Sequence, residues 1–288
     1  MLVILFGGLV ALLSGGSTSQ RRLPVAAGVA AALVPVVIGG GNLLLRFMLG
    51  MTAALIVFRS VDLARFGAQM TFGHRLWHVF AIFDTRKIAR RTPQLDVRAS
   101  LAALAWAALA GLGFAAGMRW GVSLDGPARW IVRWLAAAVF AVAAVEVLCC
   151  VVTSGYAMLG IRPPPLHDAP YLSRSVSEFW GARWNKVVSG WLRENCFKPL
   201  ARRRSPRMGL VAAFFASAFL HWYLTYISAG WWWSIPMASF FLIQLALIAA
   251  ERALGVARWH PAAARAWTLV ALIGVSPLFS EPMLALLE

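Results

Sequence analysis

Three ionisable side chains lie inside apolar stretches that are long enough to cross a bilayer: Arg46, Glu146 and His221. Burying such a group in hydrocarbon is costly, so each one needs a structural or a functional explanation. Arg46 lies near the end of its stretch, where a long side chain can reach the interface. Glu146 fits either a functional acid or a helix-packing residue with a hydrogen-bond partner. His221, in AAFFASAFLHWYLTYI, fits either a hydrogen-bonded packing residue or a general base.

A tryptophan-rich segment precedes this histidine. Residues 171–199 are YLSRSVSEFWGARWNKVVSGWLRENCFKP. Ser175 and Glu178 have the S-x-x-E spacing of a capping box, which predicts the start of a helix. Asn185 lies at the border of an apolar stripe on the wheel of this predicted helix. That stripe carries Trp180, Trp184, Val187 and Trp191. The pattern predicts an amphipathic helix in the membrane interface or at the cytosolic mouth of the protein.

The same segment resembles the hallmark of the wax synthases, which belong to the membrane-bound O-acyltransferase superfamily. That hallmark is approximately S-x-x-x-F-W-G-R-R-W-N, then L-R and an aromatic-x-P, followed by a membrane histidine in S-G-x-x-H-E. The corresponding runs here are SRSVSEFWGARWN at 173–185, LR at 192–193, FKP at 197–199 and SAFLHW at 217–222. The resemblance covers about residues 170–225, which we take as the catalytic segment.

This chain departs from the hallmark at four positions. Ala182 replaces the first arginine of the pair, and Phe197 replaces a usual tyrosine. Ala218 replaces glycine and Trp222 replaces glutamate, and both flank the histidine. These last two changes bear on the acceptor alcohol more than on the type of reaction.

The resemblance implies transfer of an acyl group from acyl-CoA to the hydroxyl of a lipophilic alcohol, as in wax ester synthesis. His221 is then the general base that removes the proton of a weakly nucleophilic hydroxyl. Asn185 orients the thioester or donates a hydrogen bond to its developing oxyanion. For this role the two side chains must face one cavity, within about 10 Å of each other. The reaction needs acyl-CoA as a co-substrate, with no further cofactor and no metal.

The CoA moiety is polyanionic, and basic residues lie beside Asn185. We predict substrate binding by Trp180, Arg183, Trp184, Lys186 and Arg193. The alternative is that the basic residues only contact lipid headgroups and that the tryptophans only pack.

The rest of the chain must place this segment in a membrane. Of its 288 residues 60% are hydrophobic and 13% are charged, about half the charged fraction of a soluble domain. The composition predicts one all-α, polytopic membrane domain, 1–288, with about eight transmembrane helices and cytosolic amphipathic helices. We expect spans at 2–17, 23–39, 43–58, 99–117, 132–152, 209–228, 235–250 and 266–280.

The distribution of positive charge predicts the orientation. Of 27 Lys and Arg residues, 23 fall in the connections on one side of these spans. The positive-inside rule makes that side cytosolic, and it places the run Trp231–Trp233 in the opposite interface. The net charge of +16 therefore reflects contact with the lipid bilayer and does not indicate nucleic acid. The Ala- and Arg-rich composition favours a bacterial plasma membrane.

Other possible sites carry weaker signals. His74 and His78 have an i, i+4 spacing but lack a third ligand, so no metal is expected. His167 follows three prolines in a connecting loop and looks like an ordinary cytosolic-face residue. The three cysteines form no CxxC pair, which argues against a disulfide framework or a thiolate metal site.

Three functional alternatives remain open, one of which is a non-catalytic membrane scaffold or lipid-binding protein. Within the same chemistry, the enzyme could be an O-acetyltransferase acting on a sterol, terpenoid or polyketide hydroxyl. From another class, it could be a proton-coupled transporter that uses Glu146 and His221 as a relay. Such a transporter predicts internal repeats and broken spans, and the sequence has no detectable repeat.

Overall fold

The computed structural model of the chain describes residues 1–288 except 17–20, 39–40, 118–122 and 286–288. It is almost entirely helical, which confirms the predicted all-α class. The described residues form two compact units. The first contains residues 1–86 and 219–235, and the second contains residues 87–218 and 236–285.

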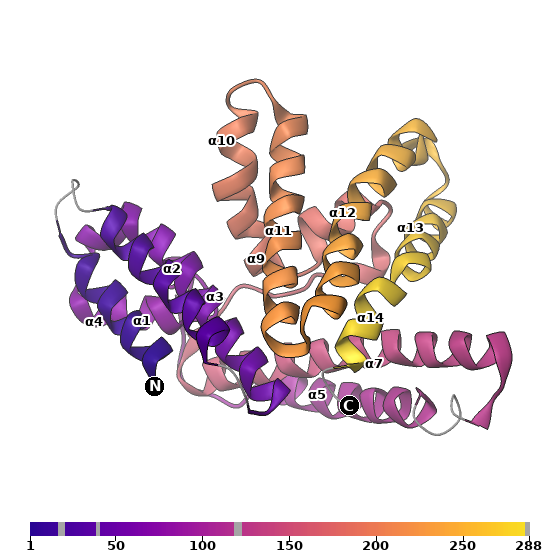
Figure 1. Cartoon of the computed structure of the whole chain (residues 1–288), viewed down its shortest axis with the longest axis horizontal. Helices are drawn as coiled ribbons and strands as arrows, with labels where there is room; N and C mark the ends of the chain where they lie inside the picture. The colour runs from indigo at the N-terminus through magenta and orange to yellow at the C-terminus, as the bar shows by residue number, and fades with distance from the viewer. Residues whose placement is uncertain (17–20, 39–40, 118–122, 286–288) are drawn as a thin grey trace. The chain divides into compact units, whose positions relative to one another are not determined.

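The first unit is built on three apolar helices, α1 (Leu2–Leu13), α2 (Arg22–Val37) and α3 (Leu43–Phe66), which pack side by side (Figure 1). Their shared core includes Val3, Val10, Ala31, Ala53 and Ile56. The last part of α11 (Pro206–Ala229) and the start of α12 (Trp231–Ala253) complete this unit. Gly230 joins the two helices with a φ of 89°, a conformation that glycine adopts without strain.

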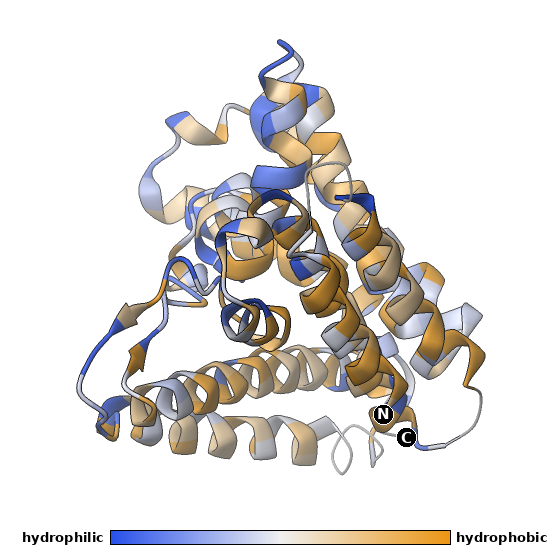
Figure 2. Ribbon diagram, turned by 90° about the vertical axis from the view of Figure 1, so that its left-hand side faces the viewer, coloured by the Kyte–Doolittle hydropathy of each residue, from blue (hydrophilic) through white to orange (hydrophobic). Residues whose placement is uncertain are grey.

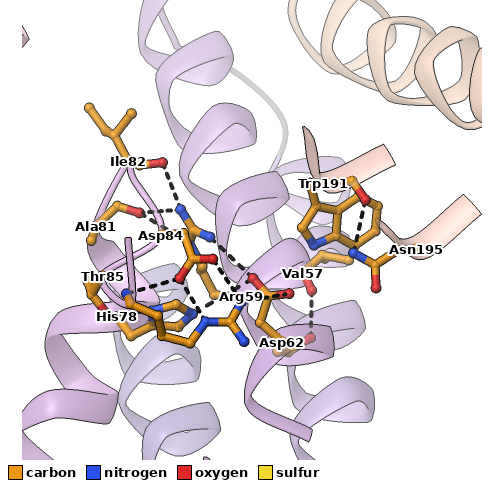
Figure 3. Close-up of polar contacts among 12 residues, drawn as sticks. Val57, Arg59, Asp62, His78, Ala81, Ile82, Asp84, Thr85, Trp191 and Asn195 are labelled. Atoms are coloured by element: carbon orange, nitrogen blue, oxygen red, sulfur yellow. Dashed lines mark hydrogen bonds and ion pairs between the residues drawn. The ribbon is translucent and has the colours of Figure 1, made fainter. Parts of the chain in front are cut away.

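A short 3₁₀ turn (Gly67–Gln69) follows α3 and leads into the amphipathic helix α4 (Phe72–Phe80). The loop that follows α4 is fixed by a buried arginine of α3 (Figure 3). Arg59 is 3% exposed, donates hydrogen bonds to the carbonyls of Ala81 and Ile82, and pairs with Asp62 at 3.2 Å. These partners explain how an arginine is accommodated within an apolar helix.

The two histidines of α4 share one partner in this loop. The Thr85 hydroxyl lies 3.0 Å from His74 Nε2 and 2.7 Å from His78 Nδ1. Their i, i+4 spacing places both rings on one face of the helix. That face holds the loop in position.

The second unit contains two long antiparallel helices, α5 (Val97–Ala115) and α7 (Gly126–Met158), which lie side by side (Figure 1). The short strands β1 (Ala89–Arg90) and β2 (Ile161–Arg162) pair antiparallel beyond one end of them. Helix α7 has 33 residues, so it is ~50 Å long and exceeds the ~30 Å hydrocarbon core.

The remainder of the second unit consists of the short elements between residues 163 and 201 and of helices from the C-terminal part of the chain. After α12, a 3₁₀ turn (Val256–Arg258) leads into α13 (Pro261–Val275) and α14 (Pro277–Leu284), which are bent by 45° relative to each other. Trp134 of α7 donates to the Ser276 hydroxyl at this bend. Two apolar clusters form the core, one around Phe240 and Phe241 and one around Val176 and Ile248.

Five of the described helices are long and apolar enough to span a bilayer, or six if the bent pair α13–α14 is one span. Helices α1 and α2, with 12 and 16 residues, are shorter. Seven of the predicted spans fall largely on single helices, and 266–280 crosses the bend between α13 and α14, although the count of eight is not confirmed. Residues 17 and 39, where two predicted spans end, lie outside the described residues. Figure 2 shows that hydrophobic residues follow the long helices and that hydrophilic ones gather in the connections. The chain is a polytopic membrane protein.

Candidate functional site

The tryptophan-rich segment begins as a helix at the predicted residue. The Ser175 hydroxyl accepts the backbone N–H of Glu178 at 2.9 Å, and Glu178 Oε2 accepts the N–H of Arg174 at 2.8 Å. Helix α8 (Val176–Glu178) follows and continues into a π-helical turn, Phe179–Arg183. The S-x-x-E spacing therefore identified this start correctly.

The prediction of one continuous amphipathic helix is wrong, because the chain breaks at Trp184 and Asn185. The backbone is extended at Trp184 (ψ 134°) and left-handed at Asn185 (φ 39°). A helical wheel therefore does not describe how the tryptophans before and after this break are oriented. The break has backbone partners in the preceding loop. The Asp168 N–H donates to the Arg183 carbonyl at 2.9 Å, and the Lys186 N–H donates to the Leu166 carbonyl at 2.7 Å. These bonds replace those that a continuing helix would make.

Asn185 is the N-cap of the next helix, α9 (Lys186–Leu192). Its Oδ1 accepts the backbone N–H of Val188 at 3.2 Å. Asparagine tolerates the left-handed conformation better than most residues and is a favoured N-cap. The cap uses the amide oxygen, so the two N–H donors of Nδ2 can serve another acceptor. A second π-helical turn, Arg193–Phe197, and α10 (Lys198–Ala201) follow α9.

The two predicted substrate-contacting tryptophans occupy different environments. Trp180 packs edge-on against Phe240 of α12, and its Nε1 donates to Gln244 Oε1 at 3.1 Å. Trp184 is stacked on Phe179 and on His167, at centroid distances of 5.4 and 4.4 Å. Trp180 thus anchors the segment to α12. Trp184 links the position beside Asn185 to the 163–168 loop.

The predicted basic residues also differ in their partners. Arg183 donates to Glu178 Oε1 at 2.6 Å and to the Asp168 carbonyl at 2.9 Å, and it therefore supports the loop. Burial favours a higher pKa for Glu178, but the Arg174 N–H and Arg183 outweigh it and lower this pKa below its usual value. Lys186 Nζ lies 3.9 Å from Asp168 Oδ2, and Arg193 is exposed. Lys186 and Arg193 are thus better placed than Arg183 to meet a phosphate.

An acidic residue of α12, which was not singled out in the sequence, also holds this segment. Glu251 is 5% exposed, and its carboxylate accepts the N–H groups of Val176 and Ser177 at 2.7 and 3.2 Å. A carboxylate is well suited to the N-terminus of a helix. Glu251 lies seven residues after Gln244, so both project from one face of α12. In the sequence, this pair of polar residues within an apolar stretch could have indicated that α12 holds another segment.

Glu146 has a partner that the sequence did not predict. His167 Nδ1 lies 2.8 Å from Glu146 Oε1. Both side chains line a cavity of about 440 Å³ together with Arg91, Arg162 and the three prolines of the 163–165 run. His167 is therefore a largely buried, hydrogen-bonded residue at a cavity and not an ordinary residue of the cytosolic face.

His221 lies on α11, fifteen residues after Pro206, which is ~22 Å along the helix axis. It is half-buried and belongs to the first unit, whereas Asn185 belongs to the second. The expected approach of the two side chains within about 10 Å stays a prediction.

These features define a class: a polytopic α-helical membrane protein in which a capped break presents an asparagine before a membrane-helix histidine. Residues 163–243 match the model of the membrane bound O-acyl transferase family. The match includes both Asn185 and His221, and it begins before the predicted 170–225 segment so that it also includes His167.

Curated plant proteins are also similar to part of the chain. Probable long-chain-alcohol O-fatty-acyltransferase 2 of Arabidopsis thaliana is 32% identical over 121 residues, 38% of this chain and 34% of that protein. The long-chain-alcohol O-fatty-acyltransferase of Simmondsia chinensis is 30% identical over 107 residues, 33% of this chain and 29% of that protein. Acyl-CoA–sterol O-acyltransferase 1 of Arabidopsis thaliana is 30% identical over 99 residues, 31% of this chain and 28% of that protein.

The chain spans about a third of the length of the curated relatives it matches. These matches confirm the predicted resemblance to wax-synthase-like proteins of the membrane-bound O-acyltransferase superfamily.

Proposed function

We propose that this protein is an O-acyltransferase that moves an acyl group from acyl-CoA to the hydroxyl of a lipophilic alcohol. The observation that carries the proposal is the geometry of Asn185 within the family-matched segment. Its amide oxygen is occupied as a helix cap at 3.2 Å from Val188 N, and its amide N–H groups are available as donors. Similarity to proteins named long-chain-alcohol O-fatty-acyltransferases supports a fatty alcohol as acceptor.

In the proposed reaction the neutral imidazole of His221 removes the hydroxyl proton as the alcohol oxygen attacks the thioester carbonyl. The carbonyl oxygen becomes an oxyanion that accepts a hydrogen bond from Asn185 Nδ2. When the intermediate collapses, the carbon–sulfur bond breaks and the proton passes from His221 to the leaving CoA thiolate. The products are an ester and free CoA.

The exposed Arg193 and the half-buried Lys186 are our candidates for the CoA phosphates, because Arg183 already has two protein partners. Trp180 and Trp184 would shape the walls of the site. Since acyl-CoA is a cytosolic metabolite, we place the 163–201 segment on the cytosolic side, in agreement with the positive-inside rule. The composition favours a bacterial plasma membrane as the location.

A sterol is the second candidate acceptor, because one relative is named an acyl-CoA–sterol O-acyltransferase. A proton-coupled transporter that uses Glu146 and His221 is less well supported. The Glu146 carboxylate is already hydrogen-bonded to His167 within the second unit.

The direct test is incubation of the purified full chain in lipid nanodiscs with labelled acyl-CoA and a panel of acceptors. We expect labelled ester and an equal amount of free CoA with at least one long-chain alcohol or sterol. Hydrolysis without ester, or no turnover with any acceptor and any acyl length, would contradict the proposal.

A further inference from the structure

Three different metal-binding side chains meet at the C-terminal part of α7. Glu146 and Cys149 are three residues apart on the helix, which places both on one face. His167 comes from the loop after β2. One ligand atom from each of these residues lies within 4.8 Å of the other two.

His167 is held in this position from several sides. Three consecutive prolines, Pro163–Pro165, restrict the chain before it. The Leu166 carbonyl accepts the N–H of Lys186 at 2.7 Å, and the Trp184 ring stacks on the imidazole. The side chains of His167 and Glu146 are only 7% and 17% exposed. The group is therefore positioned before any ligand arrives.

The donor set selects the kind of ion. An imidazole nitrogen, a thiolate and a carboxylate are all common ligands of Zn²⁺, which is borderline soft and prefers tetrahedral coordination. Ca²⁺ and Mg²⁺ prefer all-oxygen sites. The three cysteines are free, so Cys149 has no disulfide that would compete with a metal.

The fourth coordination position has room on the cavity side. All three side chains line the cavity of about 440 Å³, whose wall also contains Thr92, Gln94 and Asp96. A tetrahedral site with three protein ligands leaves one position for water. Polar neighbours can hydrogen-bond such a water.

We propose that Glu146, Cys149 and His167 bind one Zn²⁺ ion, which ties α7 to the start of the family-matched segment. On binding, a Zn–S bond replaces the S–H bond of Cys149, whose proton is released to water, and two metal–ligand bonds replace the direct contact between His167 and Glu146. The ion fixes His167, and through the stacked Trp184 ring it stabilises the break at Asn185. This proposal differs from the expectation of a metal-free protein, and it does not depend on the proposed acyl transfer.

The test uses the purified full chain, with its affinity tag removed, stripped of metal by a chelator and titrated with Co²⁺. We expect one Co²⁺ per chain, an intense thiolate-to-cobalt charge-transfer band, and loss of that band when Zn²⁺ is added. Cys149→Ser should abolish the band. Cys150→Ser is the matched control, because this neighbouring thiol is not one of the three ligands, and it should keep the band.

Two results would overturn the proposal: a wild-type chain that binds neither Co²⁺ nor Zn²⁺ stoichiometrically, or a charge-transfer band that persists in Cys149→Ser. A band lost equally in Cys150→Ser would exclude this assignment of ligands. None of these measurements involves acyl-CoA, so failure of the metal site and failure of the transferase proposal can be told apart.

Discussion

The Asn185 side chain occupies a position that few residues suit. Its backbone is left-handed with a φ of 39°, and its Oδ1 caps α9 through Val188. The family resemblance indicated Asn185 as a candidate catalytic residue, but it did not predict the left-handed break in the helix. That conformation is supported by the hydrogen bonds of its neighbours Lys186 and Arg183 to Leu166 and Asp168, 20 and 15 residues away, which local periodicity does not encode.

Asn185→Asp separates the structural role of this residue from its proposed catalytic role. Aspartate tolerates the left-handed backbone conformation, and its carboxylate can still accept the Val188 N–H and cap α9. Unlike the asparagine amide, however, the carboxylate has no N–H to donate. We expect an unchanged thermal midpoint and a rate of ester formation lowered by about 10²-fold. Asn185→Gly is the control, because glycine also adopts the left-handed conformation but has neither the oxygen that caps α9 nor the N–H donor. An Asp variant with the wild-type rate would exclude Asn185 as the oxyanion donor.

Asp84 supplies a pH-dependent contribution to stability in the loop after α4. Burial favours a higher pKa, but the side chain and backbone N–H of Arg86 outweigh it and lower the pKa of Asp84 from 3.8 to about 2. Because the folded pKa is below the unfolded one, this stabilisation is complete above about pH 4 and is lost as pH falls through about 2. Asp84→Asn should lower the free energy of unfolding by about 1 kcal/mol at pH 7 and by much less near pH 2. Equal losses of thermal midpoint at both pH values would contradict this.

At the scale of elements, the helix starts were more predictable than the contacts between elements. The S-x-x-E spacing located the beginning of α8, because a capping box is local. The carboxylate of Glu251, which accepts two N–H groups of α8, is 75 residues from Val176. The pair formed by Glu146 and His167 likewise depends on how the 163–167 loop folds back onto α7. Sequence spacing alone does not specify such long-range pairs.

Glu251→Ala should destabilise the segment around Asn185. It leaves the buried N–H of Val176, and the N–H of Ser177, without an acceptor, at a cost of about 1–3 kcal/mol. We expect a lower thermal midpoint and faster limited proteolysis between residues 163 and 186. Glu251→Gln keeps one acceptor oxygen, so its thermal midpoint should fall less than that of Glu251→Ala. A Glu251→Ala chain as stable and protease-resistant as wild type would contradict this role.

At the scale of the whole molecule, composition predicted a polytopic helical membrane protein correctly. Hydropathy located the long apolar helices, but the count of eight full spans is not confirmed, because α1 and α2, with 12 and 16 residues, are shorter than the ~20 residues that cross a bilayer. It also ended the third span at residue 58, whereas α3 continues to Phe66. Arg59 and Asp62 satisfy each other there, so their polarity does not end the helix.

The charge asymmetry predicts which residues face the cytosol. In a chain whose native cysteines are replaced by serine, Arg203→Cys should react with a membrane-impermeant maleimide only after cells are permeabilised. Trp232→Cys, at a residue that is 84% exposed, should react in intact cells. The reverse pattern would show that the predicted orientation is inverted.

The central claim is tested most directly by ester formation in His221→Ala, compared with wild type in the same nanodiscs. An alanine is tolerated in an apolar span, so the variant should insert, fold and still bind acyl-CoA. Without the general base, we expect the rate of labelled ester formation to fall by about 10²–10⁴-fold or more. Ester formation by His221→Ala at the wild-type rate would contradict the proposed mechanism.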